Sequence, residues 1–318
     1  MGESDSGQLH NSKVVITGGA GLVGQNLIVK LLASGYHSIT VIDKASRNLA
    51  IAASLHSGVT FCEADLSVPG AWQDTVAAAD VVVLLHAQIG GIESDAFYRN
   101  NITATEHVLA AASRSSYLVH VSSSVTESAA NDLYSTTKIA QEELVVNSGL
   151  RYTVLRPTLM FGWFDRKHLG WLSQFMSRSP VFPIPGDGCY IRQPLYAADF
   201  TAIIQACIEQ RPDSRSFNIS GKEKVAYIDI IRKIKAAKRS YCLLVKLPYS
   251  VFYSLLALYA LFDRNPPFTT AQLQALVLDE VFEDIDWEAA FNVRATPIDQ
   301  AIRETFTDPV YSSVRLQF

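Results

Sequence analysis

The chain has 318 residues, 48% of them hydrophobic, and a formal net charge of −4, which is enough for one large core or two unequal lobes. It contains no basic stripe and no zinc-like spacing of cysteine and histidine, so we expect neither nucleic-acid binding nor a metal site. The four cysteines are scattered without a CxxC pair, which is typical of reduced thiols in a cytoplasmic protein. The polar segment 1–12 lacks the apolar core of a secretion signal and is predicted to be disordered.

A dinucleotide-binding turn is predicted near the N-terminus. Residues 14–16 are predicted to form a short buried strand, followed by a glycine-rich turn and an apolar-periodic helix. Glycines in such a turn let the backbone bend tightly and approach a pyrophosphate, and they let the helix lie close to the strand. The helix N-terminus then faces the phosphates with free N–H groups. The residues predicted to hold the phosphates are Gly18, Gly21, Leu22, Val23 and Gly24.

The second predicted strand, 39–42, is followed at once by Asp43, nineteen positions after Gly24. A carboxylate at this place in a dinucleotide-binding unit accepts hydrogen bonds from the adenosine ribose. It also repels the 2′-phosphate of NADP, and Lys44 and Arg47 offset that repulsion only in part. Asp43 therefore favours NAD as the cofactor.

The alternation of strand and helix continues along the chain. Further strands are predicted at 59–62, 81–85, 117–121 and 152–155, and helices at 103–113 and 134–147. This pattern predicts an α/β fold with a doubly wound parallel sheet of the Rossmann type, in which ligands bind at the carboxyl ends of the strands. We place the dinucleotide-binding domain at 13–161. The loop-rich remainder, 162–318, is predicted to form a smaller substrate-binding lobe that returns to the sheet once, near 216–219.

Tyr134 and Lys138 stand four positions apart on a predicted helix, so both side chains project from one face. A nearby ammonium favours the phenolate form of tyrosine, whose ordinary pKa is ~10. Lys138 and a nicotinamide cation are expected to lower the Tyr134 pKa together, which suits proton exchange with a sugar hydroxyl. A serine after the strand 117–121 can hydrogen-bond the reacting oxygen. We favour Ser124 for this third catalytic role, with Ser123 as the second choice.

Several further motifs follow in order along the chain. They are Ala64-Asp65-Leu66, Leu85-His86-Ala87, Asn101-Ile-Thr-Ala-Thr105, Arg156-Pro157 with Phe161-Gly162, and Arg192-Gln-Pro-Leu-Tyr196. Together with the glycine turn and the Tyr134 pair, they resemble the extended short-chain dehydrogenase/reductase family over roughly residues 13 to 220. The resemblance is to its nucleotide-sugar epimerases, dehydratases and reductases in particular.

The resemblance implies the remaining site residues. Further cofactor contacts would come from Asp65, Leu66, His86, Ala87 and Pro157, in addition to Tyr134 and Lys138. The substrate would lie against Ser123 and Ser124, and Arg192, whose planar guanidinium matches phosphate oxygens, would grip its diphosphate. The imidazole of His86 itself is expected to be a packed, hydrogen-bonded side chain rather than a catalyst. The family also implies a homodimer formed by the helices near 101–112 and 134–147.

Two departures from the family bear on the reaction. The Thr-Asp-Glu triplet typical of its retaining 4,6-dehydratases is replaced by Ser124-Val125-Thr126, which removes the acid and base that eliminate water. Ser124 and Tyr134 are only ten positions apart, whereas many relatives have a longer loop there. The substrate mouth is therefore expected to be trimmed, which leaves the identity of the sugar open.

The sequence thus predicts a cytoplasmic, NAD-dependent enzyme that acts on a nucleotide-linked sugar. Epimerisation by oxidation and re-reduction at C4 is the preferred reaction. Three alternatives stay open: a nucleotide-4-keto-sugar reductase, a 3β-hydroxysteroid dehydrogenase-like enzyme on a lipid alcohol, and a non-catalytic dinucleotide-sensing protein. Asp43 argues against the NADPH that reductases more commonly use.

The apolar run at 247–262 is the one candidate for membrane contact. Its sixteen residues fall short of the ~20 needed to span a bilayer. We expect a helix packed on the smaller lobe and no membrane contact, with a position in the membrane interface as the alternative.

Overall fold

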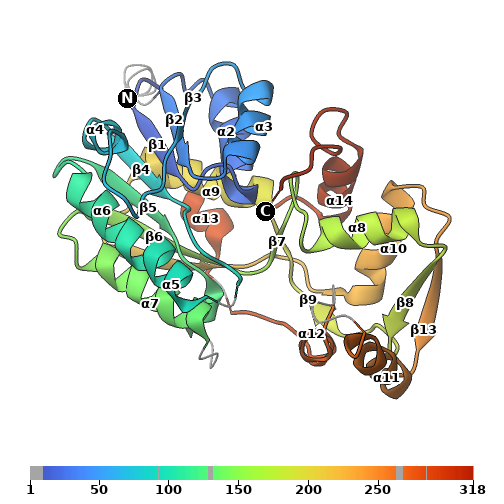
Figure 1. Ribbon diagram of the computed structural model, residues 1–318. Coiled ribbons are helices and arrows are strands. Elements are labelled where there is room, and N and C mark those ends of the chain that lie inside the picture. The colour runs from blue at the N-terminus through green and yellow to red at the C-terminus, as the bar shows by residue number, and fades with distance from the viewer. Residues whose placement is uncertain (1–9, 92, 128–131, 263–267, 284, 318) are drawn as a thin grey trace.

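The computed structural model of the chain describes residues 10–91, 93–127, 132–262, 268–283 and 285–317. This part of the chain forms two lobes (Figure 1). The larger lobe is a parallel sheet with helices on both faces, and the smaller lobe is built from helices and short strand pairs of the second half. Most of the predicted disordered segment 1–12 lies outside the described residues, as do residues 128–131 of the trimmed loop before Tyr134.

The sheet of the larger lobe contains seven described strands in the order β11-β6-β5-β4-β1-β2-β3, and every neighbouring pair is parallel. The strand order reverses between β1 and β4, and ligands of such sheets bind outside the carboxyl ends of the strands at this switch point. The predicted α/β fold of the Rossmann type is confirmed. The strands are β1 (Val14–Thr17), β2 (Ile39–Asp43), β3 (Thr60–Glu63), β4 (Val81–Leu84), β5 (Tyr117–Val121), β6 (Arg151–Pro157) and β11 (Arg215–Ile219).

Helices pack on both faces of this sheet. Side chains alternate in direction along a strand, so Val14 and Ile16 of β1 enter one core cluster and Val15 enters the other. The first cluster is completed by α2 (Leu22–Ala33), α3 (Ser46–Leu55), α9 (Ala197–Gln210) and α13 (Trp287–Phe291). The second is completed by α4 (Trp72–Ala77), α6 (Ala104–Ala111) and α7 (Leu133–Val146). The helix α5 (Ser94–Phe97) and the π-helical turn η1 (Tyr98–Thr103) lead into α6.

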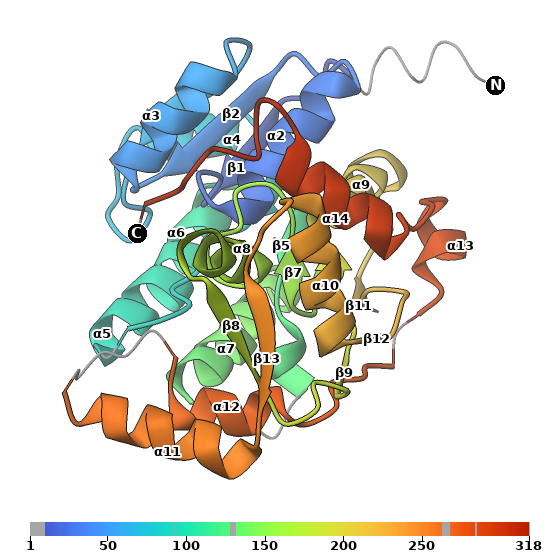
Figure 2. The same cartoon turned by 90° about the vertical axis from the view of Figure 1, so that its right-hand side faces the viewer.

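The smaller lobe has a hydrophobic core of its own, in which Ile184 packs with Ile231 and Ile302. Figure 2 views this lobe with β13 in front and with α11 and α12 at its lower end. Its strands are β7 (Met160–Phe161), β8 (Val181–Pro185), β9 (Ile191–Arg192), β10 (Leu195–Tyr196), β12 (Val225–Ala226) and β13 (Leu243–Leu247). Its helices are α8 (Leu169–Arg178), α10 (Tyr227–Ala237), α11 (Tyr249–Ala260), α12 (Thr270–Leu276) and α14 (Ile298–Thr307).

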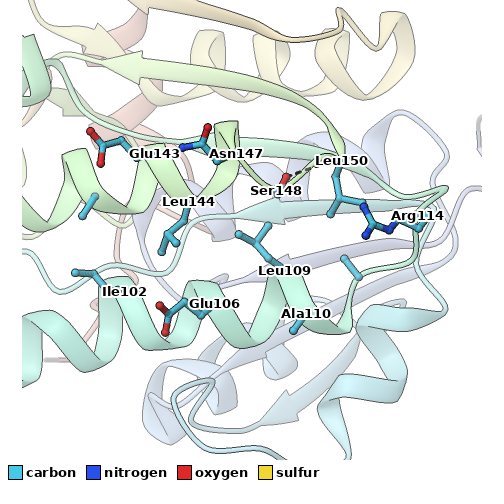
Figure 3. Close-up of a pocket in the computed structure, with 12 residues that line it drawn as sticks. Ile102, Glu106, Leu109, Ala110, Arg114, Glu143, Leu144, Asn147, Ser148 and Leu150 are labelled. Atoms are coloured by element: carbon cyan, nitrogen blue, oxygen red, sulfur yellow. Dashed lines mark hydrogen bonds between the residues drawn. The ribbon is translucent and has the colours of Figure 1, made fainter.

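A groove of about 670 Å³ lies between the outer faces of α6 and α7 (Figure 3). Its walls combine apolar side chains with charged ones, including Leu109, Leu144, Glu106, Glu143 and Arg114. None of the residues that line it is among those predicted to bind cofactor or substrate. The groove therefore belongs to a surface separate from the predicted catalytic edge of the sheet.

The second half of the chain returns to the larger lobe more than once. β11 pairs with β6 in parallel, which confirms the return predicted near 216–219. In addition, α9 packs against α2, and Trp287 and Phe291 of α13 are buried in the core of the larger lobe. The domain boundary at 162 stays a prediction, and this packing argues for counting α9, β11 and α13 with the dinucleotide-binding domain.

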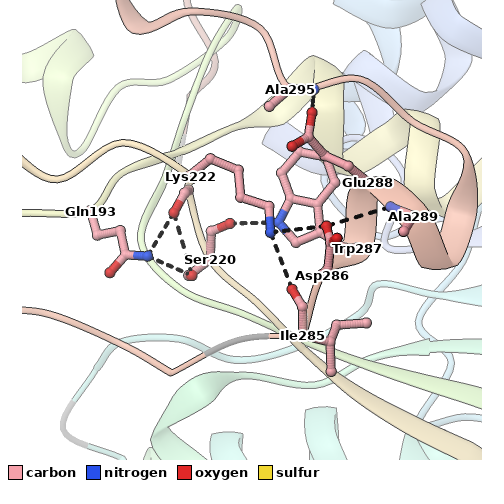
Figure 4. Close-up of polar contacts among 10 residues, drawn as sticks. Gln193, Ser220, Lys222, Ile285, Asp286, Trp287, Glu288, Ala289 and Ala295 are labelled. Atoms are coloured by element: carbon pink, nitrogen blue, oxygen red, sulfur yellow. Dashed lines mark hydrogen bonds and ion pairs between the residues drawn. The ribbon is translucent and has the colours of Figure 1, made fainter.

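Polar contacts at the end of β11 hold α13 in place (Figure 4). The Nε1 of Trp287 donates to the carbonyl oxygen of Ser220 at 2.9 Å. Lys222 Nζ lies 5.1 Å from the centre of the Trp287 ring and donates to the Ile285 carbonyl oxygen at 3.2 Å. It also lies 3.6 Å from a carboxylate oxygen of Asp286. These contacts fix the segment that leads into α13 against the end of the sheet.

The apolar run at 247–262 forms the helix α11, which packs on the smaller lobe as expected but stays at its surface. All residues of α11 are described, and none of them is buried. The helix contacts α12, and the ring centroids of Phe252 and Phe268 are 6.4 Å apart. In the described part of the chain, no helix has the length and apolar character that crossing a bilayer requires.

Candidate active site

Two glycines around the turn after β1 occupy positions where no side chain fits. Gly18 has a φ of +67°, in the left-handed region that favours glycine, and a Cβ there would lie 2.5 Å from the backbone N and Cα of His86. A Cβ on Gly24 would lie 2.3 Å from the carbonyl oxygen of Gly19. The turn is therefore in close contact with α2 and with the chain after β4, as a dinucleotide turn requires.

Gly21 differs from these glycines because a side chain there would not collide with the backbone. A Cβ there would come no nearer than 3.7 Å to another atom, the carbonyl oxygen of Gly18. Gly21 is the N-cap of α2 and has no side chain to cap the helix, so the first-turn N–H groups at Leu22 and Val23 lack acceptors within the helix. The turn thus fits a pyrophosphate, whose oxygens would accept from these N–H groups.

Asp43 ends β2 beside the glycine turn. Its Oδ2 accepts a hydrogen bond from Ala20 N at 3.0 Å, and its Oδ1 accepts one from Ala45 N at 2.9 Å. Each carboxylate oxygen can accept a second bond, and the side chain is only half-buried, so Asp43 can both brace the turn and accept from a ribose hydroxyl. Lys44, one of the two basic residues that follow Asp43, donates to Asn100 Oδ1 at 2.6 Å.

The other predicted cofactor residues lie at the carboxyl ends of neighbouring strands. Asp65 and Leu66 follow β3, and one carboxylate oxygen of Asp65 accepts from the backbone and hydroxyl of Ser67 at 2.9 and 2.7 Å. The dipeptide His86-Ala87 follows β4, and Pro157 is the last residue of β6. The topology brings these residues to one edge of the sheet, and their contacts with a cofactor stay a prediction.

The imidazole of His86 is buried and held by two threonines. Its Nδ1 lies 2.7 Å from Thr17 Oγ1, and its Nε2 lies 2.9 Å from Thr105 Oγ1. Burial, together with the nearby charge of Lys138, lowers the pKa of His86 to about 3, so the ring is neutral. The expectation of a packed, hydrogen-bonded imidazole is confirmed.

Tyr134 lies in the first turn of α7, which a capping box fixes. The side chain of the N-cap residue Asp132 accepts from Ser135 N at 2.7 Å, and Ser135 Oγ accepts from Asp132 N at 3.1 Å. The side chain of Ser123 lies close enough to the Tyr134 hydroxyl to lower its pKa. Ser124, our first choice from the sequence, begins the short 3-10 helix η2 (Ser124–Glu127). The structure thus brings Ser123 to Tyr134, and a catalytic role for Ser124 stays a prediction.

Lys138 is buried one turn further along α7. Its Nζ donates to the carbonyl oxygen of Val121 at 2.9 Å and to Gln141 Oε1 at 2.6 Å. Gln141 Nε2 in turn donates to the carbonyl oxygen of His86 at 3.2 Å and to Thr105 Oγ1 at 2.9 Å. The amine of Lys138 is therefore fixed among α7, the end of β5 and the chain after β4.

Burial sets the pKa values of this pair in the chain without its cofactor. Burial raises the pKa of Tyr134, although the nearby Ser123 side chain acts in the opposite direction. Burial also lowers the pKa of Lys138 to about 7, with the charge of Glu142 opposing the shift. Because Lys138 directs its hydrogen bonds to Val121 and Gln141, the expected lowering of the Tyr134 pKa does not come from the protein groups alone.

Arg192, predicted to grip the substrate diphosphate, is bound by the chain itself. Its buried guanidinium donates to the carbonyl oxygen of Leu278 at 2.6 Å and also to that of Leu276. A carboxylate oxygen of Glu280 lies 3.8 Å from the Arg192 Nε, and the Tyr190 ring centroid lies 5.3 Å from its Cζ. The guanidinium therefore holds the segment that follows α12, and a contact with a diphosphate stays a prediction.

The sequence profile of the NAD dependent epimerase/dehydratase family matches residues 14–220, more than half of the chain. The chain belongs to this family. It is accordingly an enzyme of the NAD-dependent epimerase/dehydratase type with NAD as its cofactor, and the family resemblance identified from the sequence motifs is confirmed. The matched span contains the glycine turn, Asp43, Tyr134 and Lys138.

Two characterised proteins are similar to this family member in sequence. The NADH dehydrogenase [ubiquinone] 1 alpha subcomplex subunit 9 of Arabidopsis thaliana is 27% identical over 146 residues, which cover 45% of this chain and 36% of that protein. The chain thus matches about a third of the length of that relative. The low-salt glycan biosynthesis protein Agl12 of Haloferax volcanii is 28% identical over 259 residues, which cover 70% of this chain and 82% of that protein.

Solved structures of nucleotide-sugar enzymes share the fold of this family member. The UDP-glucuronic acid 4-epimerase from Bacillus cereus, in complex with NAD, aligns with a TM-score of 0.71 at 20% identity, covering 92% of this chain and 97% of that one. The dTDP-glucose 4,6-dehydratase DesIV from Streptomyces venezuelae aligns with a TM-score of 0.69 at 15% identity, covering 93% and 97%. At these identities the likeness shows the fold of the enzyme.

Two amide side chains that the sequence analysis did not assign to the site support the catalytic helix of the enzyme. Gln141 follows Lys138 by three positions, and this helical spacing could have placed it on the same face from sequence alone. Asn101 Nδ2 donates to Thr137 Oγ1 of α7 at 2.9 Å, while Asn101 Oδ1 accepts from Gln88 N at 2.6 Å. The two amides join α7 to the chain that follows β4.

Proposed function

We propose that this enzyme is an NAD-dependent 4-epimerase of a nucleotide-activated sugar. The observation that carries the proposal is the position of Tyr134 beside the Ser123 side chain, one turn before the buried Lys138 and at the sheet edge that bears the glycine turn. A tyrosine hydroxyl in this position can exchange a proton with a sugar hydroxyl. The similarity to a UDP-glucuronic acid 4-epimerase supports the choice of C4.

Each residue of the site would have one role in the epimerisation. Bound NAD supplies the acceptance and return of a hydride at the sugar carbon. Tyr134 would take the proton of the C4 hydroxyl and give it back after re-reduction, and Ser123 would hold the reacting oxygen. Burial raises the Tyr134 pKa, so proton uptake by Tyr134 would require a positive charge beside the phenol. Gln141 and the Val121 carbonyl would keep Lys138 positioned close to this pair.

Dehydration and keto-sugar reduction have weaker support. Positions 124–126 carry Ser, Val and Thr, and the Asp132 carboxylate, which lies near Tyr134, is used by the capping box. Elimination of water needs a positioned acid and base, which these residues do not supply. Asp43 would repel the 2′-phosphate of NADPH, which disfavours a reductase that exchanges this cofactor at each turnover.

We expect the purified enzyme to carry bound NAD and to interconvert a pair of UDP-sugars without added reductant. An epimerase must keep its reduced cofactor until the hydride has been returned, because early release would strand the oxidised sugar. Native mass spectrometry of the purified protein measures the bound cofactor. Incubation with a panel of nucleotide sugars, with analysis of the products by chromatography, then identifies the reaction.

Other results of the same experiment would contradict the epimerase. A cofactor-free protein that converts only 4-keto sugars, and that consumes added NADH or NADPH stoichiometrically, is a reductase. Loss of water from the sugar without added reductant would show a dehydratase. Retained NAD with no turnover of any nucleotide sugar would support a dinucleotide-sensing protein or a lipid-alcohol substrate instead.

We also propose that the enzyme is a homodimer whose contact includes the groove between α6 and α7 (Figure 3). Several large apolar side chains near this groove are exposed in the single chain. They are Tyr98 on η1 and Leu133, Ile139 and Val146 on α7. Exposed apolar groups on neighbouring helices are typical of a surface that a second copy covers.

The dimer can be tested by changing the apolar side chains of α7. Sedimentation velocity should give a dimer for the unchanged protein. The double variant Ile139→Glu and Val146→Glu should be a monomer, because the new carboxylates of both subunits would be buried in the contact without partners. The exposed Val68, on the loop after β3, supplies the control Val68→Glu, which should leave the dimer intact. The proposal is wrong if the unchanged protein is a monomer.

A further inference from the structure

The helix α11 presents apolar side chains on the face that points away from the protein. Val251, Leu255 and Leu258 follow the spacing i, i+4 and i+7, which places them along one stripe. Their exposed fractions are 45%, 54% and 53%. The side chain of Phe252, by contrast, faces the protein and contacts Phe268. A helix on the surface of a soluble protein ordinarily carries polar residues on its outer stripe.

The chain that leads into α11 carries a one-sided charge, which ends at Asp263. From residue 230 to residue 262 the sequence contains no Asp or Glu, although the whole chain is acidic, with a net charge of −4. The basic residues in this span are Arg232, Lys233, Lys235, Lys238, Arg239 and Lys246. Arg232 and Lys233 pair with acidic side chains from outside the span, whereas Lys238, Arg239 and Lys246 are exposed. Lys246 lies on β13, two residues before the N-cap of α11.

Exposed tyrosines also lie on and near α11. Tyr249, Tyr253 and Tyr259 of α11 and Tyr241 before β13 are all exposed. The tyrosine ring is apolar and its hydroxyl is polar, so tyrosine is enriched where hydrocarbon meets water at a membrane surface. Figure 2 shows α11 at the edge of the smaller lobe, next to the end of β13 and remote from the sheet of the larger lobe. An extended surface could therefore approach α11 without touching the glycine turn.

We propose that α11 and the exposed basic residues on β13 and before it dock the enzyme on the surface of a bilayer that contains anionic lipids. The helix has twelve residues, about 18 Å, which is too short to cross the hydrocarbon core and suits a position in the plane of the headgroups. The outer stripe enters the boundary between headgroups and acyl chains, and the exposed Lys and Arg side chains contact the lipid phosphates. Charge complementarity selects an anionic bilayer as the occupant of this face, because a purely apolar protein contact would not account for the one-sided charge.

Co-sedimentation of the purified full chain with vesicles tests the proposal. We expect binding to vesicles of phosphatidylcholine and phosphatidylglycerol in a three-to-one ratio, weaker binding to phosphatidylcholine alone, and loss of binding at high salt, which screens the charges. The pair Leu255→Asp and Leu258→Asp should lower the partition coefficient at least about tenfold, because the apolar contact is lost. Val68 and Val310 are exposed to 57% and 52% elsewhere on the surface, so Val68→Asp with Val310→Asp is the matched control and should bind as the unchanged protein does.

A second set of variants addresses the charge. Lys238→Gln, Arg239→Gln and Lys246→Gln combined should reduce binding to the anionic vesicles on the order of a hundredfold and leave binding to neutral vesicles unchanged. The same number of charges is removed far from α11 by combining Arg151→Gln, Arg215→Gln and Lys224→Gln, which should have a much smaller effect. Retention of NAD and an unchanged circular dichroism spectrum confirm that each variant is folded.

Three results would overturn the proposal. The first is that the unchanged protein binds anionic vesicles no more strongly than neutral ones. The Leu255 and Leu258 pair could leave vesicle binding unaltered, which would place the contact elsewhere. Finally, that pair could alter the mass of the protein in solution without any effect on vesicle binding, which would show that α11 is covered by protein rather than by lipid.

Discussion

Replacing Tyr134 by Phe should lower the turnover number by ~10²- to 10⁴-fold, because the substitution removes a positioned proton donor and acceptor. This corresponds to about 3–5 kcal/mol in the barrier of the chemical step. Binding of NAD and thermal stability should change little, since the ring stays in place and only one hydroxyl is lost. Initial rates on the nucleotide sugar identified from the panel, with calorimetric titration of NAD, provide the measurement.

The matched control for this substitution is Tyr241→Phe. Tyr241 precedes β13 in the smaller lobe and its side chain is exposed, so removal of its hydroxyl should leave the rate unchanged. A Tyr134→Phe variant with near-normal turnover would show that proton transfer does not pass through Tyr134. A variant that has also lost NAD would indicate a structural role of the hydroxyl instead.

The same assay separates the two serines. Ser123→Ala should reduce the rate more strongly than Ser124→Ala, because the Ser123 side chain lies close enough to the Tyr134 hydroxyl to lower its pKa. The sequence alone favoured Ser124, since a run of three serines does not show which hydroxyl turns toward the helix. That choice depends on where the chain leaves β5 and enters η2, which is a property of the folded backbone.

The parts of the fold that depend on local pattern were predictable from the sequence. Buried strands and amphipathic helices alternate with clear periodicity, and a Cβ at Gly18 or Gly24 would collide with backbone, so those glycines mark the turn reliably. Asp43 was found because its distance from the turn is set by the length of one helix and one strand. The return of β11 was also visible as a short apolar strand.

Other features depend on contacts between segments far apart in the chain. The high apolar content of α11 is plain from the sequence, but burial is decided by which elements cover a helix, and α11 stays exposed although it packs against α12. In the same way, Trp287 packs under the sheet of the larger lobe through Ser220 and Lys222, and no local pattern predicts this. Long-range packing thus accounts for most of what the sequence analysis did not predict.

The contacts of Arg192 are also long-range and are not predictable from a local sequence pattern. Replacing Arg192 by Ala should destabilise the protein by about 2–4 kcal/mol. The guanidinium is buried and donates to the carbonyl oxygens of Leu276 and Leu278, so its removal leaves buried acceptors without a charged donor. Glu280 adds little, because its side chain is 38% exposed and lies 3.8 Å away. Thermal unfolding measures the loss, and limited proteolysis should show faster cleavage in the segment after α12.

A control and a kinetic readout distinguish this structural role from the diphosphate contact that the family resemblance implies. Arg232 forms an exposed ion pair with Asp229, so Arg232→Ala should change stability by less than about 1 kcal/mol. If Arg192 only holds the segment after α12, Arg192→Ala should lower stability while the KM for the nucleotide sugar and the KM for the free sugar change by the same factor. The opposite result would be a variant that is as stable as the unchanged protein and has a raised KM for the nucleotide sugar alone. The Arg192 guanidinium would then bind the diphosphate, and its contacts with the Leu276 and Leu278 carbonyl oxygens would be replaced when substrate binds.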